Sequence, residues 1–121
     1  MRLLNKLLII ANDAPYGGEK TWNALRLAGA AVSTEVGMRV RVFLMGDSVV
    51  AAKRGQVTPE GYYNLEKMIS DLVTKGVEVK TCGTCIKARG LRDEDLVAGV
   101  QRGTMMILAS WVKESDRVVS F

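Results

Sequence analysis

Histidine is absent from the 121 residues of the chain, and this absence has the largest consequence. Without imidazole, one chain cannot assemble a Ser-His-Asp triad or a Cys-His pair, in which histidine activates the nucleophile. The histidine ligands that catalytic zinc sites favour are missing as well. Any chemistry that this chain performs alone therefore proceeds without imidazole.

Several other features are scarce. The chain has two cysteines and 6% aromatic residues, and no apolar stretch approaches the roughly 18 residues of a membrane span. Seventeen basic against thirteen acidic side chains give a net charge of +4, and these charges are scattered, so neither nucleic-acid nor membrane binding is expected. With 48% apolar residues, the chain is expected to form one domain over residues 1–121, with a core that needs no disulfide.

The first eleven residues are apolar enough to raise the question of a secretory signal. Lys6 interrupts the run, and no small-residue cleavage site precedes Asp13-Ala14-Pro15, which resembles a turn instead. The sequence therefore predicts a cytoplasmic protein. In that compartment thiols stay mostly reduced, so both cysteines become candidates for chemistry or metal binding.

Strands are expected where short apolar or β-branched runs end at turn residues. Residues 6–11 (KLLIIA) form a nearly continuous apolar run, which is typical of a strand buried on both faces. Further strands are predicted over 39–45, 77–81 and 117–121. Because these strands alternate with helical segments, the predicted fold is a three-layer α/β/α domain with a mostly parallel central sheet of about five strands.

Helices are expected between the strands. Apolar residues recur at spacings of three and four over 22–36 and 62–72, and a glycine follows each of these segments. A short helix is predicted within 48–56, and another from residue 93, where acidic residues favour a helix start and later glycines keep the helix short. Residues 104–115 fit a strand or a helix. The helix is favoured because Ala, Leu and Met are good helix formers and because one face would carry Met105, Ala109 and Val112.

The motif with the clearest chemistry is CGTC at residues 82–85, directly after the third predicted strand. In open α/β sheets, ligands bind outside the carboxyl ends of the strands, where this pair is expected to lie. A helical turn starting there, with Lys80, Lys87 and Arg89 close in sequence, would favour thiolate over thiol. Sulfur transfer and disulfide exchange need no separate base once a thiolate exists, so Cys82 and Cys85 are the candidate catalytic residues.

Three other interpretations of this motif stay open. Free cysteines are often simply small buried apolar residues. A zinc site normally needs four ligands, so two thiolates would suffice only across a symmetry axis, and neither a bound metal nor a cofactor is predicted. A thioredoxin-type redox motif usually follows an early strand and has a proline between its cysteines, and neither condition holds here.

The loop at residues 12–18 follows the first strand and opens the first helix. Its glycines and the helix N-terminus suit an anion, but GxGxxG and the ending of a P-loop are absent, so a tight turn is favoured over a nucleotide site. In a parallel sheet this loop lies at the same edge as Cys82. The predicted pocket residues are Asn12, Tyr16 and Gly17 of this loop, together with Arg89 after the CGTC motif.

A family resemblance extends over nearly the whole chain in order. It is carried by IIANDAPYGGEKTWNALRLA (9–28), FLMGDSVVAAKRGQ (43–56), GVEVKTCGTCIKARGL (76–91) and DRVVSF (116–121). These segments resemble the DsrE/DsrF family, most closely its small bacterial members. The resemblance implies an α/β/α fold and assembly into homo-oligomers, either trimers or hexamers.

The resemblance also implies roles for the two cysteines. Relatives include sulfur-relay subunits that carry persulfide sulfur toward tRNA thiouridine formation or in dissimilatory sulfur oxidation. In those subunits the sulfur-carrying cysteine follows a GV-x-V-x-x-C pattern, which GVEVKTC at residues 76–82 matches, so Cys82 inherits the role of persulfide acceptor. The relay subunits have other residues in place of Cys85, whereas the small members have both cysteines. Cys85 is then an auxiliary or resolving thiol.

The leading prediction is therefore a cytoplasmic, sulfurtransferase-like carrier that forms a persulfide on Cys82. Two alternatives stay open, namely a thiol-disulfide redox or sensing protein that uses both cysteines, and a non-catalytic oligomeric module that binds a small ligand. The expected partners are further copies of the chain and other sulfur-carrier proteins. Six methionines and two tryptophans add weak support for an oligomer, because these residue types are enriched in interface cores.

Overall fold

The computed structural model describes residues 5–121, which form five strands, four α-helices and two 3-10 helices. The strands are β1 (Lys6–Ala11), β2 (Arg39–Leu44), β3 (Glu78–Cys82), β4 (Gln101–Gly103) and β5 (Arg117–Ser120). The α-helices are α1 (Lys20–Val32), α2 (Leu65–Thr74), α3 (Gly83–Ala88) and α4 (Met105–Glu114). The 3-10 helices are η1 (Gly46–Ala52) and η2 (Asp93–Asp95).

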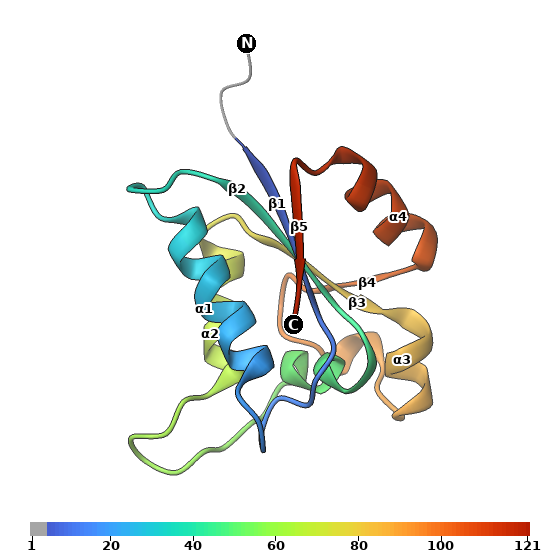
Figure 1. Cartoon of the computed structure of the whole chain (residues 1–121). Helices are drawn as coiled ribbons and strands as arrows, with labels where there is room; N and C mark the ends of the chain where they lie inside the picture. Colours follow the sequence, from blue (N-terminus) through green and yellow to red (C-terminus); the bar gives the residue numbers. More distant parts are fainter. Residues whose placement is uncertain (1–4) are drawn as a thin grey trace.

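The strands form one sheet in the order β4-β3-β2-β1-β5, and every neighbouring pair is parallel. Parallel neighbours need crossover connections, which is why helices alternate with strands. The chain steps from β1 to β2 to β3 in one direction, and α1 and α2 lie together on one face of the sheet (Figure 1). The connection from β4 to β5 runs back the other way, so α4 lies on the opposite face, as right-handed crossovers require. The predicted α/β/α fold is confirmed.

The centre of the core is β1, whose residues are buried on both faces. Leu8 and Ile9 point to opposite faces of the sheet and are both fully buried, so the strand is buried on both faces, as its apolar run predicted. In β2, Val42 and Leu44 are fully buried as well. The predicted strand limits differ from the observed ones by at most one residue, except for β4, which the sequence did not reveal.

Helix α1 is shorter than predicted, and only part of its predicted apolar stripe is fully buried. It ends at Val32 because the hydroxyl of Ser33 donates to the carbonyl of Ala30 at 2.7 Å, closing the last turn, whereas the sequence predicted helix up to residue 36. Trp22 was expected on the buried stripe but is half-buried and stacks on Tyr63 at 4.7 Å. Small side chains let the helix lie close to the sheet, and the buried face consists of Thr21, Ala24, Leu25, Ala28 and Ala31.

Helix α2 begins at Leu65, so Tyr62 lies outside the helix that the sequence predicted around it. The start is fixed by Asn64, whose side-chain oxygen accepts a hydrogen bond from the amide of Lys67 at 3.2 Å. The apolar stripe itself is as predicted, since Leu65, Ile69 and Leu72 are buried.

Helix α4 confirms that residues 104–115 are helical. Its start is capped by Thr104, whose hydroxyl accepts from the amide of Ile107 at 3.2 Å. The buried residues of this helix are Leu108 and Trp111. Trp111 packs edge-on against Phe43 with 6.0 Å between ring centroids. The face whose spacing indicated a helix, with Met105, Ala109 and Val112, is exposed.

Strand β4 lies where the sequence predicted only a short helix and its glycine boundaries. Residues 93–95 form a single 3-10 turn, and residues 101–103 then join the sheet beside β3. The close approach requires Gly103, because a Cβ on this residue would lie 2.8 Å from Cε2 of Phe43. Three residues with the sequence QRG carry no periodic pattern, so their pairing is decided by the neighbouring strand.

Candidate functional site

Cys82 is the last residue of β3 and directly precedes α3, so its thiol lies at the carboxyl edge of the sheet. Its partner across the ladder is Gly103 of β4. The side chain is 9% exposed. The structure thus places Cys82 at the end of a strand, as the sequence indicated.

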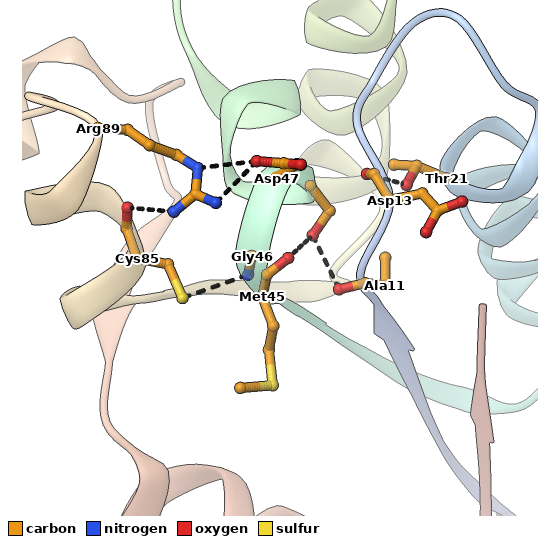
Figure 2. A network of polar contacts seen from close by, with 9 residues as sticks. Ala11, Asp13, Thr21, Met45, Gly46, Asp47, Cys85 and Arg89 are labelled. Carbon is orange, nitrogen blue, oxygen red and sulfur yellow. Dashed lines mark hydrogen bonds and ion pairs between the residues drawn. The ribbon is translucent and has the colours of Figure 1, made fainter.

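Cys85 lies in the first turn of α3, where its sulfur meets the backbone that follows β2. The amide of Gly46 donates a hydrogen bond to Sγ of Cys85 over 3.2 Å (Figure 2). Gly46 has a φ of +56°, and a Cβ on it would lie 3.3 Å from the carbonyl oxygen of Asn12. Both cysteines are free thiols.

The pKa of Cys85 is raised above the usual value for a thiol. Burial is the largest cause, and the interaction with the neighbouring Cys82 thiol adds to it. The Gly46 amide and the charge of Arg89 act in the opposite direction but are smaller effects. The expectation that a helical turn and nearby cations would favour the thiolate is therefore wrong for Cys85. This residue keeps its proton near neutral pH.

Arg89 connects α3 to η1 instead of lining the cavity beside the cysteines. Its guanidinium Nη2 lies 2.7 Å from Oδ1 of Asp47, and its Nη1 donates to the carbonyl of Cys85 at 3.0 Å (Figure 2). These contacts hold the backbone of Cys85 close to the segment that carries the Gly46 amide. Arg89 was predicted as a pocket residue, and the structure gives it a positioning role.

A cavity of about 750 Å³ opens beside the two cysteines. It lies where the carboxyl ends of β2, β3 and β4 meet the starts of α3 and α4. This size is in the range of pockets that hold small organic ligands. The residues that line it are Met45, Cys82, Gly83, Thr84, Cys85, Lys87, Arg102, Gly103, Thr104 and Met105.

The basic residues near the motif in sequence have different positions in space. Lys87 lines the cavity, as does Arg102, which the sequence did not indicate because β4 was not anticipated. Lys80 instead donates to Oε1 of Gln101 at 2.8 Å and lies 5.8 Å from the ring centroid of Trp111. Met45 and Met105 were also missed, although Met45 ends a predicted strand and the carboxyl ends of parallel strands share one edge.

The predicted pocket residues of the 12–18 loop lie elsewhere. Asn12, Tyr16 and Gly17 line a separate depression together with Asp47. The Tyr16 hydroxyl accepts from the amide of Leu65 at 3.1 Å, so it joins the loop to the start of α2. Because β2 lies between β1 and β3, the ends of these two strands are about 10 Å apart, too far for Tyr16 to wall the cysteine cavity.

Across residues 5–121, His, Cys, Asp and Glu side chains form no group of three or more that could hold a metal ion. Within the same range, no helix is both long and apolar enough to cross a membrane.

A known class of proteins combines a parallel α/β domain with a cysteine pair at the carboxyl edge of the sheet. The sequence profile of the DsrE/DsrF-like family matches residues 5–121. The chain belongs to this family.

Individual relatives support the assignment. The chain is 43% identical over 118 residues to protein YchN of Escherichia coli K12, covering 98% of this chain and 100% of YchN. The crystal structure of the E. coli YchN protein superposes with a TM-score of 0.91 over the same shares of both chains. An uncharacterized protein of Methanopyrus kandleri, MK0008, is 41% identical over 118 residues, 98% of this chain and 95% of its own. The resemblance to small bacterial members is confirmed.

A more distant structure shares the fold alone. MTH1491 from Methanobacterium thermoautotrophicum, a protein of unknown function, is 15% identical and superposes with a TM-score of 0.75, covering 98% of this chain and 99% of that one. The sheet and its helices therefore persist where most side chains differ.

Proposed function

We propose that this protein carries sulfane sulfur as a persulfide on Cys82, in the manner of a sulfurtransferase-like carrier. The observation that supports this most is the position of the Cys82 thiol, at the carboxyl end of β3 and on the wall of a cavity of about 750 Å³. A carrier needs a thiol that a donor can reach and surroundings that limit contact with water, and this placement suits both needs. Membership of the DsrE/DsrF-like family, which includes sulfur-relay proteins, adds support.

The loading step is a thiol-persulfide exchange. The thiolate of Cys82 attacks the terminal sulfur of a donor persulfide, R–S–SH, so that a new S–S bond forms as the S–S bond of the donor breaks. The donor leaves as the thiol R–SH, and the proton released from Cys82 completes the balance. No net oxidation takes place. An acceptor thiolate that attacks the terminal sulfur in the same way removes it and restores Cys82.

In this proposal, Cys85 acts as the resolving thiol. Its attack on Sγ of a Cys82 persulfide would expel hydrosulfide and leave a disulfide, so the two thiols are oxidised as the sulfane sulfur is reduced. The raised pKa of Cys85 keeps this thiol protonated near neutral pH, which makes the attack slow. A slower attack by Cys85 leaves more time for transfer of the sulfur to an acceptor.

Single-cysteine variants test the assignment. We expect Cys82→Ser to abolish persulfide formation after polysulfide treatment, as measured by intact mass and tag-switch labelling. Cys85→Ser should still form the persulfide and extend its lifetime, because the resolving attack is lost. Full labelling of Cys82→Ser with none in Cys85→Ser would reverse the roles. Labelling that neither change affects would mean that the motif is structural and favour the non-catalytic ligand-binding module.

A thiol-disulfide redox or sensing role is the second candidate, and it is favoured by the two free thiols that line the same cavity. Equilibration in glutathione buffers, followed by alkylation and mass measurement, gives the reduction potential of the pair. A reversible disulfide within a physiological range, in a protein that takes no sulfur from polysulfide, would favour this role over sulfur carriage.

We further propose that the protein works in the cytoplasm as a homo-oligomer, a trimer or a hexamer, that exchanges sulfur with other carrier proteins. The exposed apolar side chains of Met105, Met106 and Val112 on α4, together with Val118 of β5, support burial against further copies. Light scattering at micromolar concentration measures the mass directly. A monomeric mass would contradict the proposal.

A further inference from the structure

The cavity beside Cys82 has a one-sided charge pattern. Two of its lining residues are charged, Lys87 and Arg102, and both are basic. No acidic residue is part of this lining, although the acidic and basic side chains of the whole chain nearly balance. Such a cavity favours an anionic ligand over a neutral one of the same shape.

The side chain of Arg102 is held at the cavity by its surroundings. Its aliphatic part crosses the start of α3, where a Cβ on Gly83 would lie 2.8 Å from Cδ of Arg102. Its Nη2 lies 2.8 Å from Oδ2 of Asp93, which anchors the guanidinium from the side of η2. A guanidinium carries further donors beyond the one used here, so Arg102 can bind a second carboxylate.

The rest of the cavity suits an organic ligand. Met45 and Met105 supply flexible apolar walls, which adapt to varied shapes. A volume of about 750 Å³ is far larger than a small inorganic anion requires. The other basic residues near the motif are engaged elsewhere, Arg89 with Asp47 and Lys80 with Gln101.

From these observations we propose that the sulfur donor is a low-molecular-weight organic persulfide that carries a carboxylate. The carboxylate lies at Lys87 and Arg102, the apolar part lies against the two methionines, and the terminal sulfur faces Cys82. This inference rests on the proposed function, in which Sγ of Cys82 accepts the sulfur. The exchange is the balanced step given above, and the leaving thiol keeps the carboxylate.

Binding of unreactive thioethers separates charge from shape. We would titrate the protein with 3-(benzylthio)propionate and with its amide, and follow binding by NMR. We expect the acid to bind roughly fivefold more tightly, the factor that about 1 kcal/mol from partly exposed cations corresponds to, and the preference to shrink with added salt. In the double variant Lys87→Gln, Arg102→Gln the preference should vanish.

The matched control removes two exposed lysines, Lys67→Gln on α2 and Lys75→Gln directly after it, so the net charge changes equally on the face of the sheet that α1 and α2 cover. This control should keep the preference for the acid. Equal binding of acid and amide to the wild type would overturn the inference. So would an equal loss in both double variants, because the effect would then come from the total charge alone.

Sulfur loading distinguishes failure of this inference from failure of the proposed function. The persulfides of 3-mercaptopropionate and of its amide are supplied separately, and the rate of mass gain on Cys82 is measured. We expect the acid to load several-fold faster at low concentration. Equal rates would overturn the donor class and leave the carrier function standing. No mass gain from either donor would overturn the carrier function, and the assignment of a donor with it.

Discussion

Replacing Gly46 with alanine tests how rigidly the backbone beside Cys85 is fixed. At a φ of +56°, an L-residue costs about 1 kcal/mol relative to glycine. The new Cβ would also lie 3.3 Å from the carbonyl oxygen of Asn12. That carbonyl cannot move freely, because the amide of the same residue donates to the carbonyl of Phe121 at 3.0 Å. We expect the two effects together to lower the free energy of unfolding by about 2 kcal/mol.

Gly37→Ala is the matched control for this substitution. Gly37 has a φ of +69°, and a Cβ on it would meet no atom within 4 Å, so only the backbone cost applies. Both substitutions restrict the unfolded chain equally, and that contribution cancels in the comparison. Urea unfolding followed by circular dichroism, at one protein concentration because assembly would add to stability, gives the two values.

The difference between the two variants is the informative quantity. We expect Gly46→Ala to lose about 1 kcal/mol more than Gly37→Ala, or about 4 °C in Tm. Losses that agree within about 0.3 kcal/mol would refute the reasoning. In that case the carbonyl of Asn12 yields, and the amide that contacts Cys85 is not held in place by its packing.

Three further predictions concern other parts of the structure. Phe43→Ala should lower the free energy of unfolding in urea by about 3 to 5 kcal/mol, because its ring is buried and packs on Trp111. A loss below about 1 kcal/mol would show that neighbouring side chains move in to fill the space of the ring. Alkylation of Cys85 by iodoacetamide, mapped by mass, should accelerate only above the pH range of an ordinary thiol, because burial raises its pKa, and a rate that levels off near neutral pH would contradict this. The hydrogen bond with Tyr62 raises the pKa of Tyr63 to about 12, so absorbance titration at high pH should show one tyrosine that ionises at unusually high pH. Tyr62→Phe should lower the pKa of that tyrosine, and an unchanged titration curve would show that the hydrogen bond does not cause the shift.

Local sequence was sufficient for the elements whose pattern is set by their own residues. The apolar run at 6–11 gave a strand buried on both faces, because its residues from Leu7 to Ala11 carry no polar side chain that could face water. Helix formers gave α4 although its MMIL segment resembles a strand. The placement of the CGTC motif at a strand end also followed, since β3 is a short β-branched run that stops at Cys82.

Tertiary structure decided which face of each helix is buried. In α1 the small side chains of Ala24 and Ala28 meet the sheet, and in α4 the buried residues are Leu108 and Trp111. An apolar stripe shows that a helix has a buried side. How closely the helix approaches the sheet determines which of several adjacent apolar positions fills that side, and this depends on residues distant in sequence.

The composition of the cavity was likewise a consequence of strand order. Met45, Cys82 and Arg102 meet because β2, β3 and β4 are neighbours in the sheet, whereas Tyr16 follows β1 and is separated from Cys82 by one strand. The sequence by itself determined which strand ends could carry chemistry. It did not determine their order, because pairing between parallel strands is set by the fit of whole side-chain layers and not by any local signal.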